Sequence, residues 1–310
     1  MALISVIVPA FEEENNIVPT AESIAGALDG TGRDLELIFV DDGSRDHTWD
    51  RIRERSAADP RVRGIRFSRN YGKEAAIFAG LEAAKGDCCV VMDGDGQHPA
   101  SVLPEMVSLW KQGFEVVEGV KKDRGRESAV HTAAAGIFYR WISRAAGLDL
   151  SRASDYRLLD RKVVDALNRL PERNVFFRAL SGWLGFRRTT VEFSVAERKT
   201  GESKWSTRAL IRYALSNITS FTSAPLHIVT VLGLVMLAVS VIFGLIALVQ
   251  KFTGRALGGF TTVILLQLFT GSILMISLGI IGYYIGRIYE EIKGRPRFVI
   301  TEECGDKKKE

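Results

Sequence analysis

The sequence is poor in cysteine, and its few cysteines are not spaced for cross-links or metals. There are three, Cys88, Cys89 and Cys304. An odd number with two adjacent members is not the pattern of a disulfide framework, and no zinc-like spacing is present. We therefore expect small buried apolar side chains in a reducing compartment.

A strong charge of one sign is also missing. The formal net charge is +4 over 310 residues, which is too small to indicate nucleic acid as a partner. Basic residues gather beside the apolar segments described next, where anionic lipid head groups suit them better. No binding to nucleic acid is therefore expected.

Charge is absent from two long stretches. Neither residues 226–249 nor residues 260–286 contain Asp, Glu, Lys or Arg. Each stretch exceeds the roughly 20 residues that a helix needs to cross a bilayer, whereas long helices of soluble proteins show a polar face. We expect membrane helices at 226–250 and 260–286, joined by a turn at 251–259, rather than two buried helices of a soluble core.

The flanks of this hairpin carry more basic residues than its turn. The turn has Lys251 and Arg255, whereas the flanks have lysine or arginine at 199, 204, 208, 212, 287, 293, 295 and 297. The positive-inside bias places both flanks, and hence both termini, in the cytoplasm. No signal peptide is expected, because the first apolar run is short and acids follow at once. The expected parts are a cytosolic domain at 1–205, a juxtamembrane amphipathic helix at 206–225, the hairpin, and a cytosolic tail at 287–310.

Two further segments, 128–147 and 206–221, place apolar residues on one helical face and arginines on another. Helices of this kind lie flat on membrane surfaces, although packing against a sheet would leave the same pattern. Glycines within the hairpin permit close helix packing. A homo-oligomer formed through the hairpin is therefore a hypothesis.

The first hundred residues alternate between strand and helix patterns. Continuous apolar, β-branched runs predict strands, and apolar stripes with capping signals predict helices. The strands are expected at 3–9, 35–44, 62–68 and 87–96, and the helices at 13–30, 45–57 and 73–86. This alternation is typical of an α/β fold whose mostly parallel sheet is covered on both faces.

Acidic residues gather where these strands end, which is where such sheets bind ligands. Asp41 and Asp42 follow one strand, and Asp93 and Asp95 follow another. Each cluster alone suits an ordinary turn, but two at one edge indicate a site. Close carboxylates repel unless a cation joins them, and Mg²⁺ or Mn²⁺ binds carboxylate and phosphate oxygens together. We expect Asp95 to ligate the metal directly, with Asp93 facing the metal or a ribose.

Five ordered stretches resemble a known family. They are SVIVPAFEEENNI, FVDDGSRDHT, SRNYGKEAAIFAGLEAAKGD, MDGDGQHP and SDYRLLDR. Together they resemble inverting family 2 glycosyltransferases with the GT-A fold, and above all the polyprenyl-phosphate type, which includes dolichol-phosphate mannose synthases and bactoprenol glucosyl transferases. The likeness continues through the hairpin to GRIYEEIKGRPRFVI near the C-terminus. It implies a Rossmann-like GT-A catalytic domain carried on two membrane helices.

The resemblance also implies residue roles. Donor-binding candidates are Pro9, Glu13, Asp41, Asp42 and Gln97, with Asp42 near the base or ribose. Asp93 and Asp95 match the family's catalytic metal and diphosphate pair, and Asp155 matches its proposed catalytic aspartate. Acceptor-binding candidates are Arg124, Arg126, Arg157, Lys204 and Trp205.

The implied reaction is attack by a polyprenyl phosphate, such as undecaprenyl phosphate, on the anomeric carbon of a nucleotide-sugar, with inversion. A phosphate oxygen is already ionised at pH 7, so Asp155 is expected to orient an arginine or the donor rather than accept a proton. The two-helix form favours UDP-glucose in a bacterial-type inner membrane. GDP-mannose is the alternative, and galactose, N-acetylhexosamine and a modified arabinose stay open.

Two other readings fit the motifs less well. Processive polysaccharide synthases usually carry Gln-x-x-Arg-Trp and more membrane helices, and no glutamine here is followed by that pattern. A non-catalytic nucleotide-sugar sensor or flippase partner would have a degraded Asp-x-Asp, whereas residues 93–95 are intact.

Overall fold

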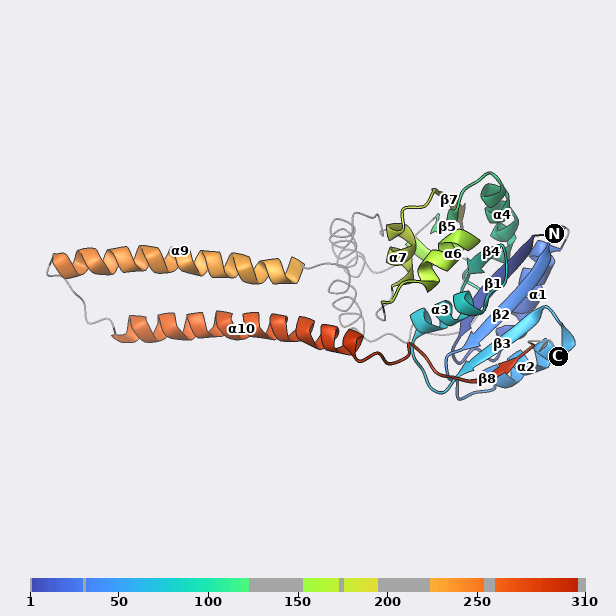
Figure 1. The fold of residues 1–310 in the computed structure, drawn as a ribbon, viewed down its shortest axis with the longest axis horizontal. Helices are drawn as coiled ribbons and strands as arrows, with labels where there is room; N and C mark the ends of the chain where they lie inside the picture. The colour runs from blue at the N-terminus through green and yellow to red at the C-terminus, as the bar shows by residue number, and fades with distance from the viewer. Residues whose placement is uncertain are drawn as a thin grey trace. The chain divides into compact units, whose positions relative to one another are not determined.

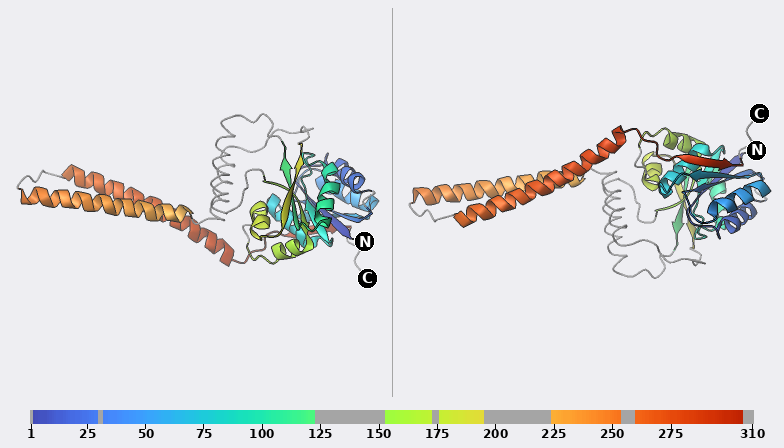
Figure 2. Two further views of the ribbon diagram at one scale, coloured as in Figure 1. Left: turned by 90° about the horizontal axis from the view of Figure 1, so that it is seen from above. Right: turned by 90° about the horizontal axis from the view of Figure 1, so that it is seen from below.

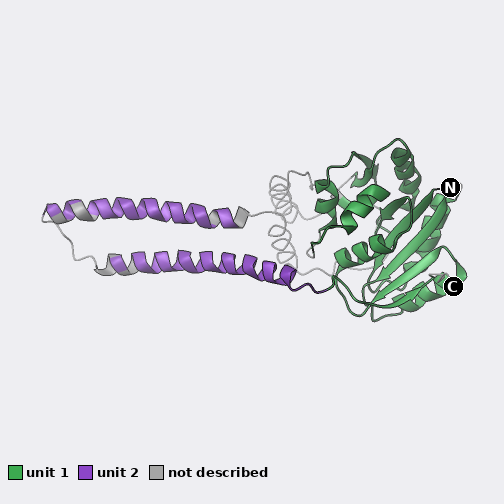
Figure 3. Cartoon of the chain, viewed as in Figure 1, with its two compact units in different colours: residues 1–207, 296–310 green, residues 208–295 purple. Residues whose placement is uncertain are grey.

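The computed structural model describes residues 2–29, 32–122, 153–172, 176–194, 224–253 and 260–305. These divide into two compact units, residues 1–207 with 296–310 and residues 208–295 (Figure 3). Several predictions lie outside the described residues: the surface helices at 128–147 and 206–221, and the acceptor candidates Arg124, Arg126, Lys204 and Trp205.

The first unit is built on an eight-stranded sheet in the order β7-β5-β6-β4-β1-β2-β3-β8 (Figure 1). Its centre is the parallel set β1 (Leu3–Ala10), β2 (Asp34–Asp41), β3 (Val62–Phe67) and β4 (Cys88–Val91). Beyond β4, the antiparallel strand β6 (Ala153–Asp160) pairs with β5 (Val116–Lys121), and β7 (Arg188–Phe193) runs parallel to β5. The predicted mostly parallel α/β sheet is confirmed.

Alternate residues of β1 face the two layers of helices. Val6 and Val8 belong to the buried cluster that includes residues of α1 (Ile17–Leu28), α2 (Thr48–Ala58) and α4 (Leu103–Lys111), which follows the short η1 (Ala100–Val102). Ile7 faces the other way, where α3 (Lys73–Ala83) approaches so closely that a Cβ on Gly80 would lie 2.2 Å from its Cγ2. The remaining short helices are α6 (Arg161–Asn168) and α7 (Phe177–Trp183).

The C-terminal segment adds a strand that the sequence pattern does not reveal. Residues expected to form a cytosolic tail include β8 (Ile300–Cys304), which pairs antiparallel with β3 at the edge of the sheet (Figure 2). Phe298, just before it, stacks on Phe67 with ring centroids 4.9 Å apart. The described residues 296–305 therefore belong to the first unit.

The described residues of the second unit form two long apolar helices, α9 (Ala224–Phe252) and α10 (Phe260–Ile292). Within them, Val229–Ile246 and Leu266–Ile292 are long and apolar enough to cross a membrane. Their large apolar side chains are mostly exposed, including Leu237, Phe269 and Met275. This exposure disfavours the alternative of two buried helices in a soluble core. The helix α10 also extends beyond the expected end at residue 286.

Candidate active site

The loops that follow β2 and β3 are joined through Asp42. Its carboxylate accepts hydrogen bonds from the backbone nitrogens of Tyr71 at 2.6 Å and Gly72 at 2.9 Å. Burial raises the pKa of Asp42 to about 6, although these two bonds act in the opposite direction. Asp42 therefore fixes the shape of this edge, and a contact to a base or ribose stays a prediction.

The loop after β1 is held by the turn after β2. The backbone nitrogen of Glu12 donates to Ser44 Oγ at 2.9 Å, and that of Glu13 donates to Thr48 Oγ1 at 2.9 Å. The Glu13 carboxylate accepts from Asn16 Nδ2 at 2.5 Å. Glu13 thus lies at the strand-end edge, as does Pro9 near the end of β1. Their roles in donor binding stay predictions.

Gly43 is required where these loops meet. Its φ is +71°, and an added Cβ would lie 2.4 Å from the backbone carbonyl carbon of Arg69. We expect Gly43→Ala to lower the free energy of unfolding by at least about 2 kcal/mol, because both the left-handed backbone and the contact penalise a side chain.

Gly26→Ala is the matched control for this substitution. Gly26 is exposed in α1, and an added Cβ there meets no atom within 4 Å. Alanine in an exposed helix should stabilise the chain by up to about 1 kcal/mol. Thermal unfolding in detergent measures both variants, and equal effects would contradict the packing described at Gly43.

A cluster of alternating charges lies where β4 ends and β6 begins. Lys73 Nζ, at the start of α3, is 2.5 Å from Asp93 Oδ1 and 2.6 Å from Asp155 Oδ2. Arg178, on α7, holds both oxygens of Asp155, with Nε 2.5 Å from Oδ1 and Nη2 2.8 Å from Oδ2. The predicted metal-site residue Asp93 and the predicted catalytic residue Asp155 therefore share one lysine.

The two cations keep Asp155 ionised. Burial would raise its pKa, but the charges of Lys73 and Arg178, and their hydrogen bonds to it, hold the pKa far below its usual range. Likewise the two carboxylates raise the pKa of Lys73, although partial desolvation acts in the opposite direction. A carboxylate held this way is a weak proton acceptor at neutral pH, because two cations already occupy its oxygens. Its geometry suits an anchor better than a general base.

Glu74 lies next to this cluster, and its pKa is shifted upwards, opposite to that of Asp155. Its Oε2 accepts a hydrogen bond from the backbone nitrogen of Phe177 at 2.8 Å. Burial, and then the negative charge of Asp155, raise the pKa of Glu74 to about 7, although Arg178 and Lys73 oppose this. The folded protein therefore binds a proton at Glu74 more tightly than the unfolded chain does, and stability falls as pH rises towards 7.

Glu74→Gln is expected to remove this loss, because glutamine keeps an acceptor for Phe177 without a charge. The variant should gain stability over the parent as pH rises from 4.5, the ordinary pKa, to about 7. The gain at pH 8 should exceed that at pH 5 by more than about 1 kcal/mol. Thermal unfolding at the two pH values measures it, with Glu22→Gln on the exposed face of α1 as control. A gain that does not depend on pH would contradict the assignment.

Asp95 and Gln97 lie in the loop that follows β4. The backbone nitrogen of Gln97 donates to Asp95 Oδ1 at 3.0 Å. His98 Nδ1 accepts from the backbone nitrogen of Asp93 at 2.9 Å, and its ring stacks on Tyr156. His98 is thus a buried support for the loop, and burial lowers its pKa.

The loop after β4 can hold a divalent ion only if a bound ligand supplies further coordinating atoms. Among the described residues there is no group of three or more His, Cys, Asp or Glu side chains arranged to hold a metal. Asp93 and Asp95 offer the carboxylate oxygens that Mg²⁺ and Mn²⁺ prefer, and Lys73 already pairs with Asp93. Mg²⁺ in particular is often bound by one or two carboxylates together with substrate phosphates. The donor set therefore fits a metal that arrives with a diphosphate.

Arg157 neighbours the strand-end cluster but is buried in the interior. Its side chain is 1% exposed, and it donates to Ser181 Oγ and to the backbone oxygens of Arg178 and Ser154. Glu118 provides a counter-charge at 3.6 Å. These bonds support α7, the helix that carries Arg178. Contact with an acceptor stays a prediction for which this interior position offers no support.

Sequence reasoning assigned no role to Lys73, Arg178 or Glu74. Lys73 and Glu74 stand in the stretch SRNYGKEAAIFAGLEAAKGD, directly after the chain leaves β3. This position, in a quoted motif just after a strand, was the sequence signal that could have indicated a role for Lys73 and Glu74. Arg178 stands outside the quoted motifs, and no pattern in its local sequence indicates a functional role.

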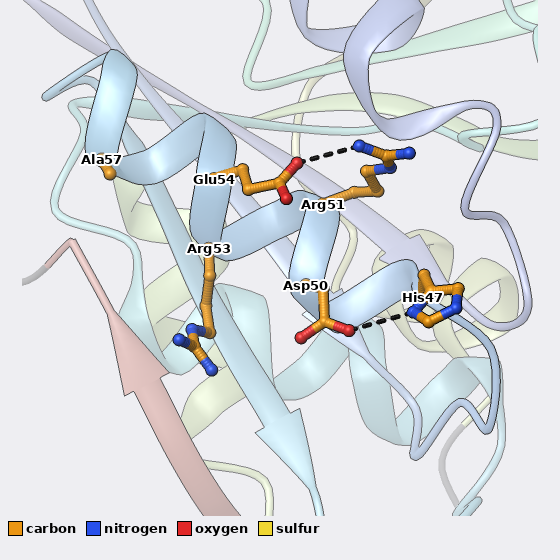
Figure 4. A pocket seen from close by; sticks show the side chains of 6 residues that line it. All are labelled: His47, Asp50, Arg51, Arg53, Glu54 and Ala57. Carbon is orange, nitrogen blue, oxygen red and sulfur yellow. Dashed lines mark hydrogen bonds and ion pairs between the residues drawn. The ribbon is translucent and has the colours of Figure 1, made fainter.

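A separate hollow lies along α2 and shares no residue with this cluster. It is lined by His47, Asp50, Arg51, Arg53, Glu54 and Ala57 (Figure 4). Its contacts, a His47–Asp50 hydrogen bond at 3.2 Å and an Arg51–Glu54 ion pair at 3.0 Å, join residues three apart on one exposed helix. This is an ordinary solvated helix face, so the candidate active site is the strand-end cluster.

Comparison with known proteins identifies the family of the chain. The family model for glycosyl transferase family 2 matches residues 5–165. The chain is 39% identical to the uncharacterized glycosyltransferase YkcC of Bacillus subtilis, over 97% of this chain and 94% of that protein. It is 34% identical to the bactoprenol glucosyl transferase of Shigella phage SfII, over 96% and 97%.

Solved structures support the fold. A mycobacterial protein matches with a TM-score of 0.50 at 21% identity, covering 71% of this chain and 75% of that one. Glucosyl-3-phosphoglycerate synthase from Mycobacterium tuberculosis, in complex with Mn²⁺, UDP and phosphoglyceric acid, matches with a TM-score of 0.50 at 20% identity, covering 70% and 76%. At this identity the likeness concerns the fold alone.

Proposed function

The chain belongs to glycosyltransferase family 2, and we propose that it transfers glucose from UDP-glucose to a polyprenyl phosphate with inversion. One observation carries the choice of acceptor. Asp155 is occupied by Lys73 and Arg178, so the cluster provides cations rather than a free base. That arrangement suits an acceptor that is already an anion. The bactoprenol glucosyl transferase at 34% identity supports the lipid.

The donor is proposed to lie across the loops after β1, β2 and β4. Asp95, and Asp93 beside it, would hold Mg²⁺ or Mn²⁺ together with the diphosphate. When bound, the ion supplies positive charge that stabilises the leaving nucleotide diphosphate. Lys73 adds a fixed cation 2.5 Å from Asp93. Pro9, Glu13 and Gln97 are proposed to contact the donor, while Asp41 and Asp42 hold the loops in shape.

The acceptor phosphate is proposed to approach the cationic side of the Asp155 cluster. Its oxygen is ionised at pH 7, so no proton has to be removed before it attacks the anomeric carbon. Lys73 and Arg178 attract and orient it, and Asp155 keeps these two side chains in place. Preorganised charge of this kind, rather than proton transfer, is then the main protein contribution.

The two apolar helices α9 and α10 are proposed to anchor the enzyme in the membrane that holds its lipid acceptor. The catalytic unit and both termini are proposed to lie in the cytoplasm of a bacterial-type cell, at the inner membrane, and the basic flanks of the hairpin support this orientation. Arg124, Arg126, Lys204 and Trp205 are proposed to contact the acceptor, and the hairpin to permit homo-oligomers.

A donor panel tests the proposal and separates UDP-glucose from GDP-mannose. The full chain in detergent receives undecaprenyl phosphate, Mg²⁺ or Mn²⁺, and one radiolabelled donor at a time: UDP-glucose, UDP-galactose, UDP-N-acetylglucosamine or GDP-mannose. We expect label from UDP-glucose in the organic phase, and none after EDTA. Label from GDP-mannose alone would change the proposed donor from UDP-glucose to GDP-mannose. Label from no donor would contradict the proposed transfer.

A further inference from the structure

The C-terminal strand reaches the candidate donor site through a single arginine. In β8, Glu302 Oε1 accepts from Arg66 Nη1 at 2.9 Å, and Glu302 Oε2 accepts from Trp49 Nε1 at 3.0 Å. Arg66 lies on β3 and also pairs through Nε with Asp41 Oδ2 at 3.4 Å. Arg66 therefore joins a carboxylate of the C-terminal strand to a predicted donor-site residue.

Asp41 is the buried end of this pair. Its side chain is 0% exposed, whereas that of Glu302 is 45% exposed. Asp41 Oδ2 makes no hydrogen bond within the described part of the chain, so the Arg66 cation compensates a carboxylate that burial alone would disfavour. Burial raises the pKa of Asp41, and Arg66 acts in the opposite direction.

The contacts continue from Asp41 to the loop that follows β1. Asp41 Oδ1 accepts from the backbone nitrogen of Ser44 at 2.9 Å, and Ser44 Oγ accepts from that of Glu12 at 2.9 Å. Glu12 has a φ of +56°, a left-handed conformation that a side chain disfavours. Such a conformation persists where neighbouring groups hold it. The bond from Ser44 is one of these, and Glu13 follows directly.

Two further contacts position Arg66, one from β8 and one from α2. Thr301 Oγ1 donates to the backbone oxygen of Arg66 at 3.2 Å, and the Arg66 guanidinium lies 5.9 Å from the centre of the Trp49 ring. The pairing of β3 with β8 also changes register between Arg66 and Phe67. The position of the arginine thus depends on residues that follow α10 in the chain.

We propose that Glu302 is a positioning residue for the donor site: it holds Arg66 against Asp41, and so sets the loops that receive the nucleotide-sugar. The inference rests on the proposed function, because it takes this edge as the donor site. It gives the segment after the second apolar helix a role in donor affinity, separate from anchoring.

Glu302→Gln tests the inference, with Glu303→Gln as the matched control. Glu303 is the next residue of β8 and is exposed. Glu303→Gln therefore removes the same charge from the same strand as Glu302→Gln does. Using the full chain in detergent, we would measure KM for UDP-glucose, KM for undecaprenyl phosphate, kcat, and the Kd of UDP by calorimetry with Mg²⁺ present. Thermal unfolding shows whether each variant folds.

We expect Glu302→Gln to raise the donor KM and the UDP Kd about three- to tenfold. The acceptor KM and kcat should stay within about twofold, as should every constant of Glu303→Gln. Arg66→Lys should act like Glu302→Gln, because lysine lacks the fork that spans both carboxylates. The double variant should be no worse than the worse single variant.

Three results would overturn the inference. Equal constants for Glu302→Gln and Glu303→Gln would do so while leaving the proposed transfer intact. A rise in both KM values together with a lower unfolding temperature would reduce Glu302 to a structural role. A parent protein that neither binds UDP nor uses UDP-glucose would remove the proposed donor, and the inference with it.

Discussion

Asp95→Asn is expected to lower kcat for transfer by about a thousandfold, the scale seen when one preorganised group that stabilises developing charge is lost. Asparagine keeps an oxygen that can accept from the Gln97 backbone nitrogen, as Asp95 Oδ1 does at 3.0 Å. The loop should therefore keep its shape while the site loses a charged metal ligand. Initial rates at saturating donor and acceptor, over a range of Mn²⁺ concentrations, measure the effect.

Asp50→Asn is the control for this change of charge. Asp50 lies on the exposed side of α2 and pairs with His47 at 3.2 Å, apart from the strand-end cluster. Its substitution should leave kcat within about twofold, since exposed ion pairs contribute little. Asp95→Asn with a near-normal rate and an unchanged requirement for Mn²⁺ would contradict the assignment of Asp95.

Asp155→Asn is expected to lower the free energy of unfolding by about 3 kcal/mol, because it leaves the partly buried Arg178 and the more exposed Lys73 without their shared buried carboxylate. The Asp155 side chain is 4% exposed, and Lys73 and Arg178 both lie within 2.6 Å of it. Asparagine can accept hydrogen bonds but cannot neutralise the charges of Lys73 and Arg178. For a unit of this size the unfolding temperature should fall by roughly 6–12 °C.

The rate of this variant separates an anchor from a base. If Asp155 anchors Lys73 and Arg178, kcat should fall less than in Asp95→Asn, and Asp155→Glu should recover part of the loss. Asp165→Asn, which removes an exposed pair with Arg161 at 3.7 Å, should change stability by less than about 0.5 kcal/mol. A stable Asp155→Asn protein as inactive as Asp95→Asn would restore the base role.

The central strands and the strand-end aspartates could be predicted because their signals are local. Apolar runs such as 3–9 predicted β1, and the turn residues after them predicted an edge with Asp41, Asp42, Asp93 and Asp95. For two strands, the sequence pattern predicted an end several residues beyond the observed one. The second strand ends at Asp41 because its carboxylate takes the Ser44 nitrogen, and the fourth ends at Val91, before the loop that carries Asp93.

The missed features depend on contacts distant in sequence. The strand β8 has the polar sequence ITEEC and pairs with β3 more than 230 residues earlier, so no local periodicity identifies it. Arg178 meets Asp155 only because α7 packs beside β6. Arg157 was expected near the acceptor on the strength of its motif, but its bonds to Ser181 and to two backbone oxygens hold it in the interior.

The most direct test of the proposed transfer is the structure of the product formed from UDP-glucose and undecaprenyl phosphate with Mg²⁺. Proton and phosphorus NMR of the purified lipid would give both the linkage and the anomeric configuration. The proposal predicts β-linked glucose joined to the lipid through the phosphate, since the donor is α-linked and an ionised phosphate oxygen attacks from the opposite face. An α-linked product, or no glucosylated lipid from active protein, would contradict it.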